Sequence, residues 1–389
     1  MTPVTPEVVD WLTRLVAIDT TSRDSNLPLI DLVADHARSL GLTPHVFPTP
    51  DGAKANLILT VPDADGGTCG GVMLSGHTDV VPVDGQPWTS DPFTLTERDG
   101  RYYGRGTADM KGFDAVVLAA LPAMLAQPLR QPIHLALSYD EEVGCQGAGP
   151  MVAALAELGL APEVTFVGEP TSMRMICAHK SINVIRIAVR GLAAHSSLTN
   201  QGVNAIEYAA SLVRWWRVRC DRWRDEGPYD DGYPIAHTTG AVTMISGGNG
   251  VNIIPAEADV TLEFRAVAEV DDAEVIAELR AACAEVEEAM RAEDASASVT
   301  VTVETSTVGL ESPPDAPAVR LGEALGLEAL PDKVTYGTEA GVYSDAGISA
   351  VVCGPGDIAQ AHKPDEFIEA SQLAACEAFI GRLITHLRA

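Results

Sequence analysis

The sequence predicts an α/β domain whose mostly parallel sheet is covered by helices, with a second, smaller α+β domain inserted into it. Three observations lead to this prediction. Unbroken apolar runs alternate with helical patterns up to about residue 175, strictly alternating runs replace them from about residue 180, and the first pattern returns after about residue 305. Unbroken runs are typical of strands buried on both faces, and alternation is typical of half-buried antiparallel strands.

The first domain opens with an amphipathic helix. Thr5 suits its N-cap and Pro6 its first helical position. One face carries an apolar stripe of Val8, Trp11, Leu12, Leu15 and Val16.

Three buried strands follow, and each ends in a polar turn. The apolar runs 72–74, 133–137 and 164–167 lead to these turns. The turns carry His77 and Asp79, then Asp140, Glu141 and Glu142, and then Glu169. Because ligands bind beyond the carboxyl ends of parallel strands, these turns predict a binding site.

The inserted domain follows the element order βαββαβ, which is that of the ferredoxin-like unit. Its expected elements are a strand at 183–190, a helix at 203–224, strands at 240–245 and 259–265, a helix at 272–290 and a strand at 299–303. We expect the first domain to comprise residues 1–178 and 307–389, and the ferredoxin-like domain residues 179–306.

Length and charge narrow the classes of function. A chain of 389 residues exceeds what one hydrophobic core usually supports, in agreement with two domains. The 54 acidic residues against 26 Lys and Arg give a formal net charge of −28. Such a surface repels nucleic acid and anionic membranes, and it attracts metal cations and cationic small molecules. An acidic shell that keeps the protein soluble would explain most of the excess without any partner.

We expect a cytoplasmic protein. No apolar run of about 18 residues indicates a transmembrane helix, and the N-terminus lacks the pattern of a signal peptide. The seven cysteines are scattered and form no CxxC pair, so neither a disulfide framework nor a zinc knuckle is expected.

Metal-ligand residue types occur at several of the turns. His77 and Asp79 lie two apart, and a metal-bound imidazole usually donates its other N–H to a carboxylate, the role expected of Asp79. Taken alone, most such pairs are surface turns. Asp109 lies in the glycine-rich segment GRGTADMKG, where its carboxylate can bridge two cations or, alternatively, cap the following helix.

Further carboxylates and a second histidine extend the set. Glu141 and Glu142 would repel each other in one cleft, which favours a bound cation or proton unless they form a solvated acidic turn. One can bind a metal while the other accepts a proton from water, as a metallohydrolase requires. Glu169 and His362 follow other strands. Imidazole and carboxylate ligands without a thiolate suit zinc, cobalt or manganese.

The ordered motifs SGHTDVVP, GRGTADMKG, SYDEEVG, VGEPT, AAHSS and QAHKPDE resemble the M20 family of dinuclear zinc peptidases and deacylases over nearly the whole chain. The resemblance implies two metal ions that share a bridging aspartate. It also implies a general base and a carboxylate that supports the first histidine. The ligands would be His77, Asp109 and Glu169 for one ion and Asp109, Glu142 and His362 for the other, with Glu141 as base and Asp79 as support. It also implies a cis peptide bond after Asp109.

Within that family, YGRGTADMKGFDA, YGTEAG and CGPGDIAQAHKPDE resemble the branch that hydrolyses N2-acetyl-L-ornithine to L-ornithine and acetate. Succinyl-diaminopimelate desuccinylases carry arginine where this chain has Val342, which argues against a succinylated substrate. Glu339 could pair with the side-chain ammonium of ornithine, or it could serve only as a cap or support. The alternatives are another deacylase or dipeptidase of the family and a non-catalytic binding protein on the same fold.

Three residues of the inserted domain complete the implied site. In the family the histidine of AAHSS, here His195, reaches the active site of the partner subunit and stabilises the oxyanion, which implies a homodimer. An interface or cap histidine is the alternative. Asn252 in SGGNGVNIIP and Arg265 at the end of LEFR resemble residues that contact the substrate, with Arg265 suited to its α-carboxylate.

Overall fold

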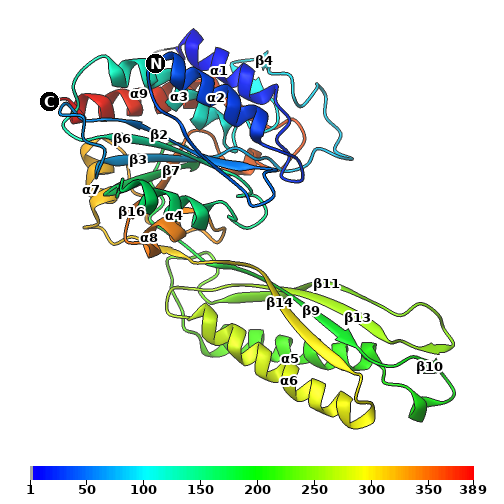
Figure 1. Ribbon diagram of the computed structural model, residues 1–389. Coiled ribbons are helices and arrows are strands. Elements are labelled where there is room, and N and C mark those ends of the chain that lie inside the picture. Colours follow the sequence, from blue (N-terminus) through cyan, green and yellow to red (C-terminus); the bar gives the residue numbers. More distant parts are fainter. Residues whose placement is uncertain (1–2) are drawn as a thin grey trace. The chain divides into compact units, whose positions relative to one another are not determined.

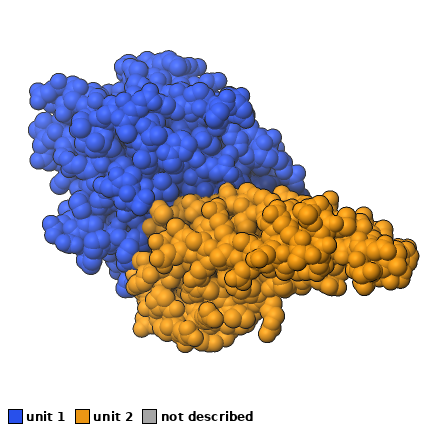
Figure 2. Space-filling view, turned by 60° about the horizontal axis from the view of Figure 1, so that its bottom comes forward, with its two compact units in different colours: residues 1–178, 310–331, 338–389 blue, residues 179–309, 332–337 orange. Residues whose placement is uncertain are grey.

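The computed structural model describes residues 3–389, which form two compact units (Figure 1, Figure 2). Unit 1 contains the described residues up to Ala178 together with Leu310–Pro331 and Thr338–Ala389, and unit 2 contains His179–Gly309 and Asp332–Gly337. Unit 2 is therefore inserted into the chain of unit 1. The chain passes between them at β8 (Ala178–His179), just before β15 (Leu310–Glu311), and again before residue 332 and after residue 337.

Unit 1 is built on a six-stranded sheet in the order β1-β2-β6-β3-β7-β16. Its strands are β1 (His45–Pro48), β2 (Ala55–Val61), β3 (Val72–His77), β6 (Ile133–Ser138), β7 (Val164–Pro170) and β16 (Ser349–Gly354). β3 runs parallel to β6 and β7, β16 runs parallel to β7, and β2 is antiparallel to both of its neighbours. Because every residue of β3, β6 and β7 is buried, the prediction of a mostly parallel, two-side-covered sheet is confirmed.

Helices cover both faces of this sheet (Figure 1). One face carries α1 (Pro6–Val16), α2 (Leu27–Ser39), α3 (Lys111–Leu125) and α9 (Ala370–Leu387), and the other carries α4 (Ala148–Leu158), α7 (Pro317–Ala324) and α8 (Ala340–Asp345). Phe166 of β7 packs edge-on against Phe379 of α9, with ring centroids 5.2 Å apart. Fully burying such a side chain stabilises the fold by roughly 1.5–3 kcal/mol.

The first helix departs from its prediction in one detail. Its apolar stripe is buried, as the spacing predicts. Thr5 occupies the N-cap position, but its side chain makes no capping hydrogen bond. Its hydroxyl instead donates to Oε1 of Glu377 at 2.6 Å, so Thr5 joins the first helix to α9.

A small three-stranded sheet in the order β17-β5-β4 also belongs to unit 1. Its strands are β4 (Thr96–Arg98), β5 (Arg101–Tyr103) and β17 (Phe367–Glu369). β17 pairs with β5, and just beyond this pairing the backbone N–H of Gly104 donates to the carbonyl of Glu366 at 3.0 Å. The pairing therefore sets the turn before α3 beside the segment that follows the short 3-10 helix η2 (Ile358–Gln360).

Unit 2 is a four-stranded antiparallel sheet in the order β11-β13-β9-β14, with two helices on one face (Figure 1). In chain order its main elements are β9 (Ile182–Arg190), α5 (Ala205–Glu226), β11 (Thr239–Gly247), β13 (Glu257–Arg265), α6 (Asp272–Glu293) and β14 (Ser298–Thr307). β10 (Ala194–His195) pairs with β12 (Ile253–Ile254), and η1 (Thr199–Gln201) is a single 3-10 turn. The buried apolar side chains of β9 are Ile185, Ile187 and Val189, the face that the alternation predicts.

Within the described residues, no helix combines the length and the apolar character needed to cross a membrane.

Candidate metal centre

Parallel strands bring the predicted ligands of unit 1 to one edge of its sheet, because the carboxyl ends of such strands meet there. The side chains emerge at the ends of β3 and β7 and in the segments that follow β6 and β16: His77, Glu169, Glu142 and His362. Asp109 joins them from the turn before α3. The peptide bond between Asp109 and Met110 is cis, as the family resemblance implies.

Asp109 lies between the two histidines. Its Oδ1 is 3.1 Å from Nε2 of His77, and its Oδ2 is 3.2 Å from Nε2 of His362. Nε2 of His77 is also 3.7 Å from Oε1 of Glu169, and Nε2 of His362 is 2.9 Å from Oε2 of Glu142. The two oxygens of Asp109 therefore belong to two groups of donor atoms, one around each histidine.

These separations fit metal coordination. Ligand atoms at about 2.0–2.1 Å from a tetrahedral ion are about 3.3 Å apart, within the range measured around the two histidines. Single ligand atoms of His77, Glu141 and Glu169 also lie within 4.8 Å of one another. The side chain of His362 is 54 % exposed, whereas that of His77 is 1 % exposed, so the group around His362 is the open one.

The carboxylates at this edge have strongly altered pKa values. Burial raises the pKa of Glu169 and of Glu141 well above the usual value, and neighbouring carboxylates add to the effect. Burial and the nearby Asp109 raise the pKa of Glu142 to about 7. Burial would also raise the pKa of Asp109, but hydrogen bonds with the two histidines outweigh it and lower that pKa. Hydrogen bonds to Asp109 and Glu142 raise the pKa of His362 to about 10.

The donor set fits divalent cations. Carboxylates this close together need protons or cations to offset their repulsion. Oε1 of Glu169 is buried and has no hydrogen-bond partner among the described residues. A buried acceptor left in this state costs about 1–3 kcal/mol, a cost that a coordinated cation would remove. Nitrogen and carboxylate ligands of this kind suit zinc, cobalt or manganese.

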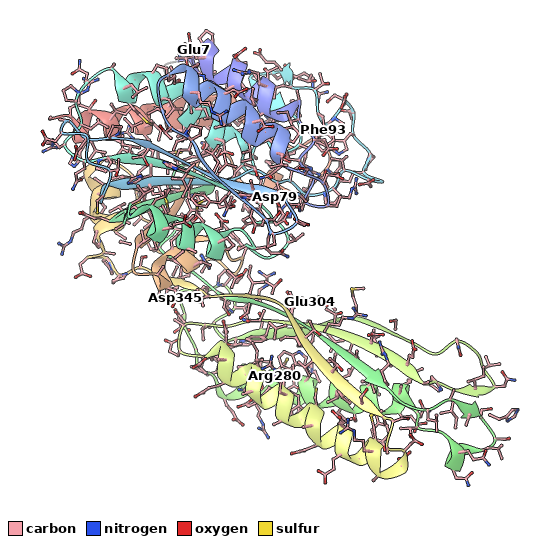
Figure 3. All side chains as sticks on the ribbon, in the orientation of Figure 1. Glu7, Asp79, Phe93, Arg280, Glu304 and Asp345 are labelled. Atoms are coloured by element: carbon pink, nitrogen blue, oxygen red, sulfur yellow. The ribbon has the colours of Figure 1, made fainter. Side chains whose placement is uncertain are left out.

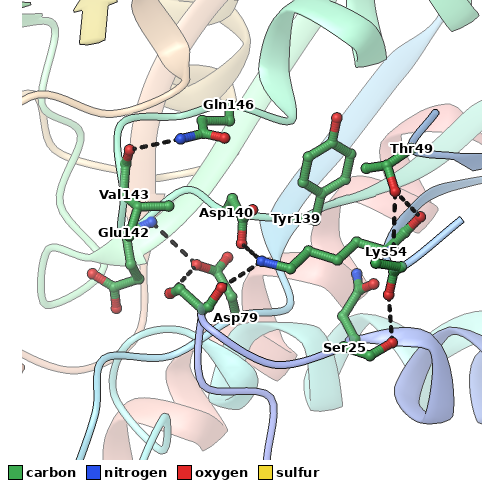
Figure 4. A network of polar contacts seen from close by, with 12 residues as sticks. Ser25, Thr49, Lys54, Asp79, Tyr139, Asp140, Glu142, Val143 and Gln146 are labelled. Atoms are coloured by element: carbon green, nitrogen blue, oxygen red, sulfur yellow. Dashed lines mark hydrogen bonds and ion pairs between the residues drawn. The ribbon is translucent and has the colours of Figure 1, made fainter. Parts of the chain in front are cut away.

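Asp79, labelled in Figure 3, follows the end of β3 and belongs to neither donor group. Nδ1 of His77 is 2.9 Å from the main-chain oxygen of Asp79 and 3.5 Å from its Oδ1. The carboxylate accepts hydrogen bonds from the backbone N–H of Glu141 at 3.0 Å and from the hydroxyl of Ser22 at 2.7 Å. It also accepts one from the backbone N–H of Glu142 at 3.3 Å (Figure 4). The closer contact with His77 thus runs through the main chain, while the carboxylate holds the turn after β6.

Lys54 holds the same turn from the other side. Its ammonium donates to Oδ1 of Asp140 at 2.5 Å and to the main-chain oxygen of Ser22 (Figure 4). Asp140 has φ = 54°, in the left-handed region that few non-glycine residues adopt. The ion pair therefore fixes an unfavourable backbone geometry directly before Glu141.

The predicted site residues of unit 2 lie in two places. His195 is exposed in β10, and its Nδ1 is 2.8 Å from Oγ of Ser197. The next residue, Ser196, donates its backbone N–H to the carbonyl of Asn252 at 3.0 Å, so His195 and Asn252 belong to adjoining segments. Arg265 ends β13, where its guanidinium donates to the carbonyl of Thr335 at 3.4 Å.

Glu339 lies at the start of α8 in unit 1 and is 1 % exposed. It accepts a hydrogen bond from the hydroxyl of Tyr343 at 3.4 Å, and its Oε1 has no hydrogen-bond partner among the described residues. Burial raises its pKa to about 7. Glu339 is thus a buried carboxylate that forms no ion pair with Lys or Arg among the described residues, and its charge contributes to the raised pKa of Glu141.

Several contacts at the centre were not predicted from the sequence. Besides Lys54, the thiol of Cys145 donates to Oε1 of Glu141 at 3.4 Å. Glu366 is 1 % exposed and accepts hydrogen bonds from the turn that carries Asp109. The spacing of four residues between Glu141 and Cys145 was the available signal for one of these contacts, since such residues meet within a single turn.

Comparison with known proteins places these residues in a wider group. Residues 73–386 match Peptidase family M20/M25/M40. The chain is 36 % identical to a protein of Myxococcus xanthus named acetylornithine deacetylase, over 99 % of both chains. It is 35 % identical to a protein of the same name from Klebsiella pneumoniae, over 93 % of this chain and 91 % of the relative.

Solved structures share the fold at low sequence identity. The M20 family metallo-carboxypeptidase Sso-CP2 of Sulfolobus solfataricus superposes with a TM-score of 0.74 at 16 % identity, covering 98 % of this chain and 99 % of that one. The YXEP protein of Bacillus subtilis, described as a dinuclear metal binding peptidase from the M20 family, gives 0.64 at 14 % identity, covering 98 % and 97 %.

Proposed function

The chain belongs to peptidase family M20/M25/M40, and on that premise we propose that it hydrolyses N2-acetyl-L-ornithine to L-ornithine and acetate. The observation that carries the proposal is Asp109, with one carboxylate oxygen in each of two histidine-centred donor groups. Similarity over nearly the full length to proteins named acetylornithine deacetylase supports the choice of substrate.

The site would hold two divalent ions, zinc or cobalt, that share Asp109. The remaining ligands would be His77 and Glu169 for one ion, and Glu142 and His362 for the other. Bound there, such ions supply positive charge that polarises a carbonyl group and lowers the pKa of water.

Glu141 would act first as general base and then as general acid. It stands in one donor group with His77 and Glu169, and the thiol of Cys145 contacts its carboxylate. It accepts the proton of the attacking water and delivers it to the amine of the departing ornithine.

Residues outside the metal ligands would recognise the substrate. Arg265 pairs with the α-carboxylate, and Asn252 contacts the same end of the substrate, as the motif resemblance implies. Glu339 pairs with the side-chain ammonium, because its buried carboxylate lacks a cationic partner among the described residues. Val342 supplies no positive charge for a succinyl carboxylate.

A homodimer would complete the site, with His195 of the second subunit stabilising the oxyanion. β11 supports this proposal, because it is an edge strand of the sheet of unit 2 and exposes Met244 and Ile245. A second copy can cover such an edge.

We place this small-molecule enzyme in the cytoplasm, with neither nucleic acid nor a membrane as partner. The free thiols and the net charge of −28 support this placement.

An assay of N2-acetyl-L-ornithine hydrolysis tests the proposed function, with the released acetate measured as the product. We expect turnover by the metal-loaded protein, loss of turnover after treatment with a chelator, and recovery on addition of zinc or cobalt. N-succinyl-diaminopimelate and an uncharged N-acetyl amino acid serve as comparison substrates. Preference for either comparison substrate would contradict the proposed substrate, and full activity in the chelated protein would contradict the metal requirement.

A further inference from the structure

We propose that Glu366 is a positioning residue that sets the distance between Asp109 and His362 and thereby the affinity of the metal position that they share with Glu142. This inference rests on the proposed function only in assuming that the centre holds metal ions. It concerns a residue that would bind neither an ion nor the substrate.

Glu366 accepts hydrogen bonds from the backbone of the turn before α3. Its Oε1 accepts hydrogen bonds from the N–H groups of Ala108 at 2.9 Å and Asp109 at 3.1 Å. Its Oε2 accepts from the N–H of Gly106 at 3.0 Å and from the guanidinium of Arg105 at 2.7 Å. Both carboxylate oxygens are thus used to fix the turn from which the side chain of Asp109 projects.

The same residue is tied to the loop of His362. Glu366 follows His362 by four residues, and its carbonyl accepts the N–H of Gly104 at 3.0 Å. Arg105 also donates to the carbonyl of Lys363 at 3.4 Å. The two turns are therefore joined through Glu366 and Arg105, directly behind the 3.2 Å approach of His362 to Asp109.

The arrangement requires a carboxylate rather than an amide. All four partners of Glu366 are donors, and both of its oxygens accept. An amide in this place offers one oxygen and one NH2 group, so its nitrogen would face N–H donors in a site where the side chain is 1 % exposed. Glu366→Gln should push the two turns apart at nearly constant side-chain volume.

The group around His77 should respond differently. Of its ligands only Asp109 depends on Glu366, because His77 and Glu169 come from β3 and β7, whose pairing in the sheet does not involve Glu366. The loss of Glu366 should therefore weaken the ion near His362 more than the ion near His77. A residue that only stabilised the fold would weaken both positions alike.

The test is a cobalt titration of the metal-free protein at controlled free Co²⁺, with bound metal measured by elemental analysis and the d–d absorption recorded at each step. We expect two ions per wild-type chain. In Glu366→Gln we expect the ion near His362 to lose at least tenfold more affinity than the ion near His77, because the first position loses the placement of both Asp109 and His362 and the second only that of Asp109. Activity should recover at high cobalt. Glu369→Gln is the matched control. Glu369 lies three residues after Glu366 and forms an ion pair with Arg101, so its substitution should leave both affinities unchanged.

Two unchanged affinities in Glu366→Gln, or an equal loss at both positions, would overturn the inference. If the glutamine variant does not fold, Glu366→Asp decides. Its shorter carboxylate cannot reach all four donors, so it should weaken the position near His362 more than the position near His77. Failure of the wild-type protein to bind metal would refute the proposed function instead, so the two failures are distinguishable.

Discussion

Oδ1 of Asp79 accepts a hydrogen bond from the backbone N–H of Glu141 at 3.0 Å. This bond joins the turn after β3 to the turn after β6, and it places the proposed base relative to His77. Asp79 thus acts on two residues at once, through its main-chain oxygen on the histidine and through its carboxylate on the base.

Asp79→Asn should therefore reduce both metal affinity and turnover. An amide cannot accept from the backbone N–H groups and from Ser22 with both of its polar atoms. Losses of about 10–100-fold are typical when the support of a metal-binding histidine is changed. Steady-state kinetics and metal analysis check this. Asp84→Asn, in an exposed pair with Arg23, is the control, and equal behaviour of the two variants would refute the role.

Glu141→Gln should abolish turnover while leaving the metal content nearly normal. The amide keeps the size of the side chain but cannot accept the proton, and general acid–base catalysis contributes about 10²–10⁴-fold. Elemental analysis of the same preparation separates this effect from loss of metal. Activity within about tenfold of wild type would show that another group is the base.

The sequence motifs predict the ligands because their positions follow from chain order and strand ends. His77 and Glu142 occur in short apolar-to-polar segments, and a parallel sheet brings such segments together. The ligand partners within each group, in contrast, rested on the family resemblance.

Glu366 and Lys54 could not be predicted in the same way. Glu366 bonds mainly to backbone N–H groups, which every non-proline residue has, so its partners leave no trace in residue types. Lys54 and Asp140 are 86 residues apart in the sequence, and helical or strand periodicity cannot predict a contact over such a separation. For Thr5 the predicted N-cap position is correct, but its side chain contacts Glu377 of α9 instead of capping its own helix.

Glu339→Gln should lower the preference for N2-acetyl-L-ornithine over an uncharged N-acetyl amino acid. Burial raises the pKa of Glu339 to about 7, and a substrate ammonium would stabilise its ionised form. We expect the ratio of kcat/KM values for the two substrates to fall about tenfold or more, a loss of about 1.4 kcal/mol of discrimination. Tyr343→Phe, which removes only the hydroxyl that contacts Glu339, is the control. An unchanged ratio in Glu339→Gln would restrict Glu339 to a structural role.

His179 should make the stability of unit 2 sensitive to acid. Burial lowers its pKa to about 4 from 6.5, so the unfolded chain binds the proton more tightly. Stability is complete above pH 6.5 and is lost as the pH falls towards 4, by on the order of 3 kcal/mol for this residue. Urea unfolding of the metal-free protein at pH 7 and pH 4.5, followed by tryptophan fluorescence, measures the loss. Trp216 and Trp223 are buried in unit 2 and report on it.

His179→Asn separates this contribution from that of the acidic residues, which also titrate in this range. The variant should be less stable at pH 7, because it loses a buried ring, yet it should lose about 2–3 kcal/mol less than wild type on acidification. His386→Asn, at an exposed position of α9, should lose as much as wild type. If His179→Asn and wild type lose equal stability between the two pH values, protonation of His179 does not cause the acid destabilisation. The loss would then come from protonation of the carboxylates.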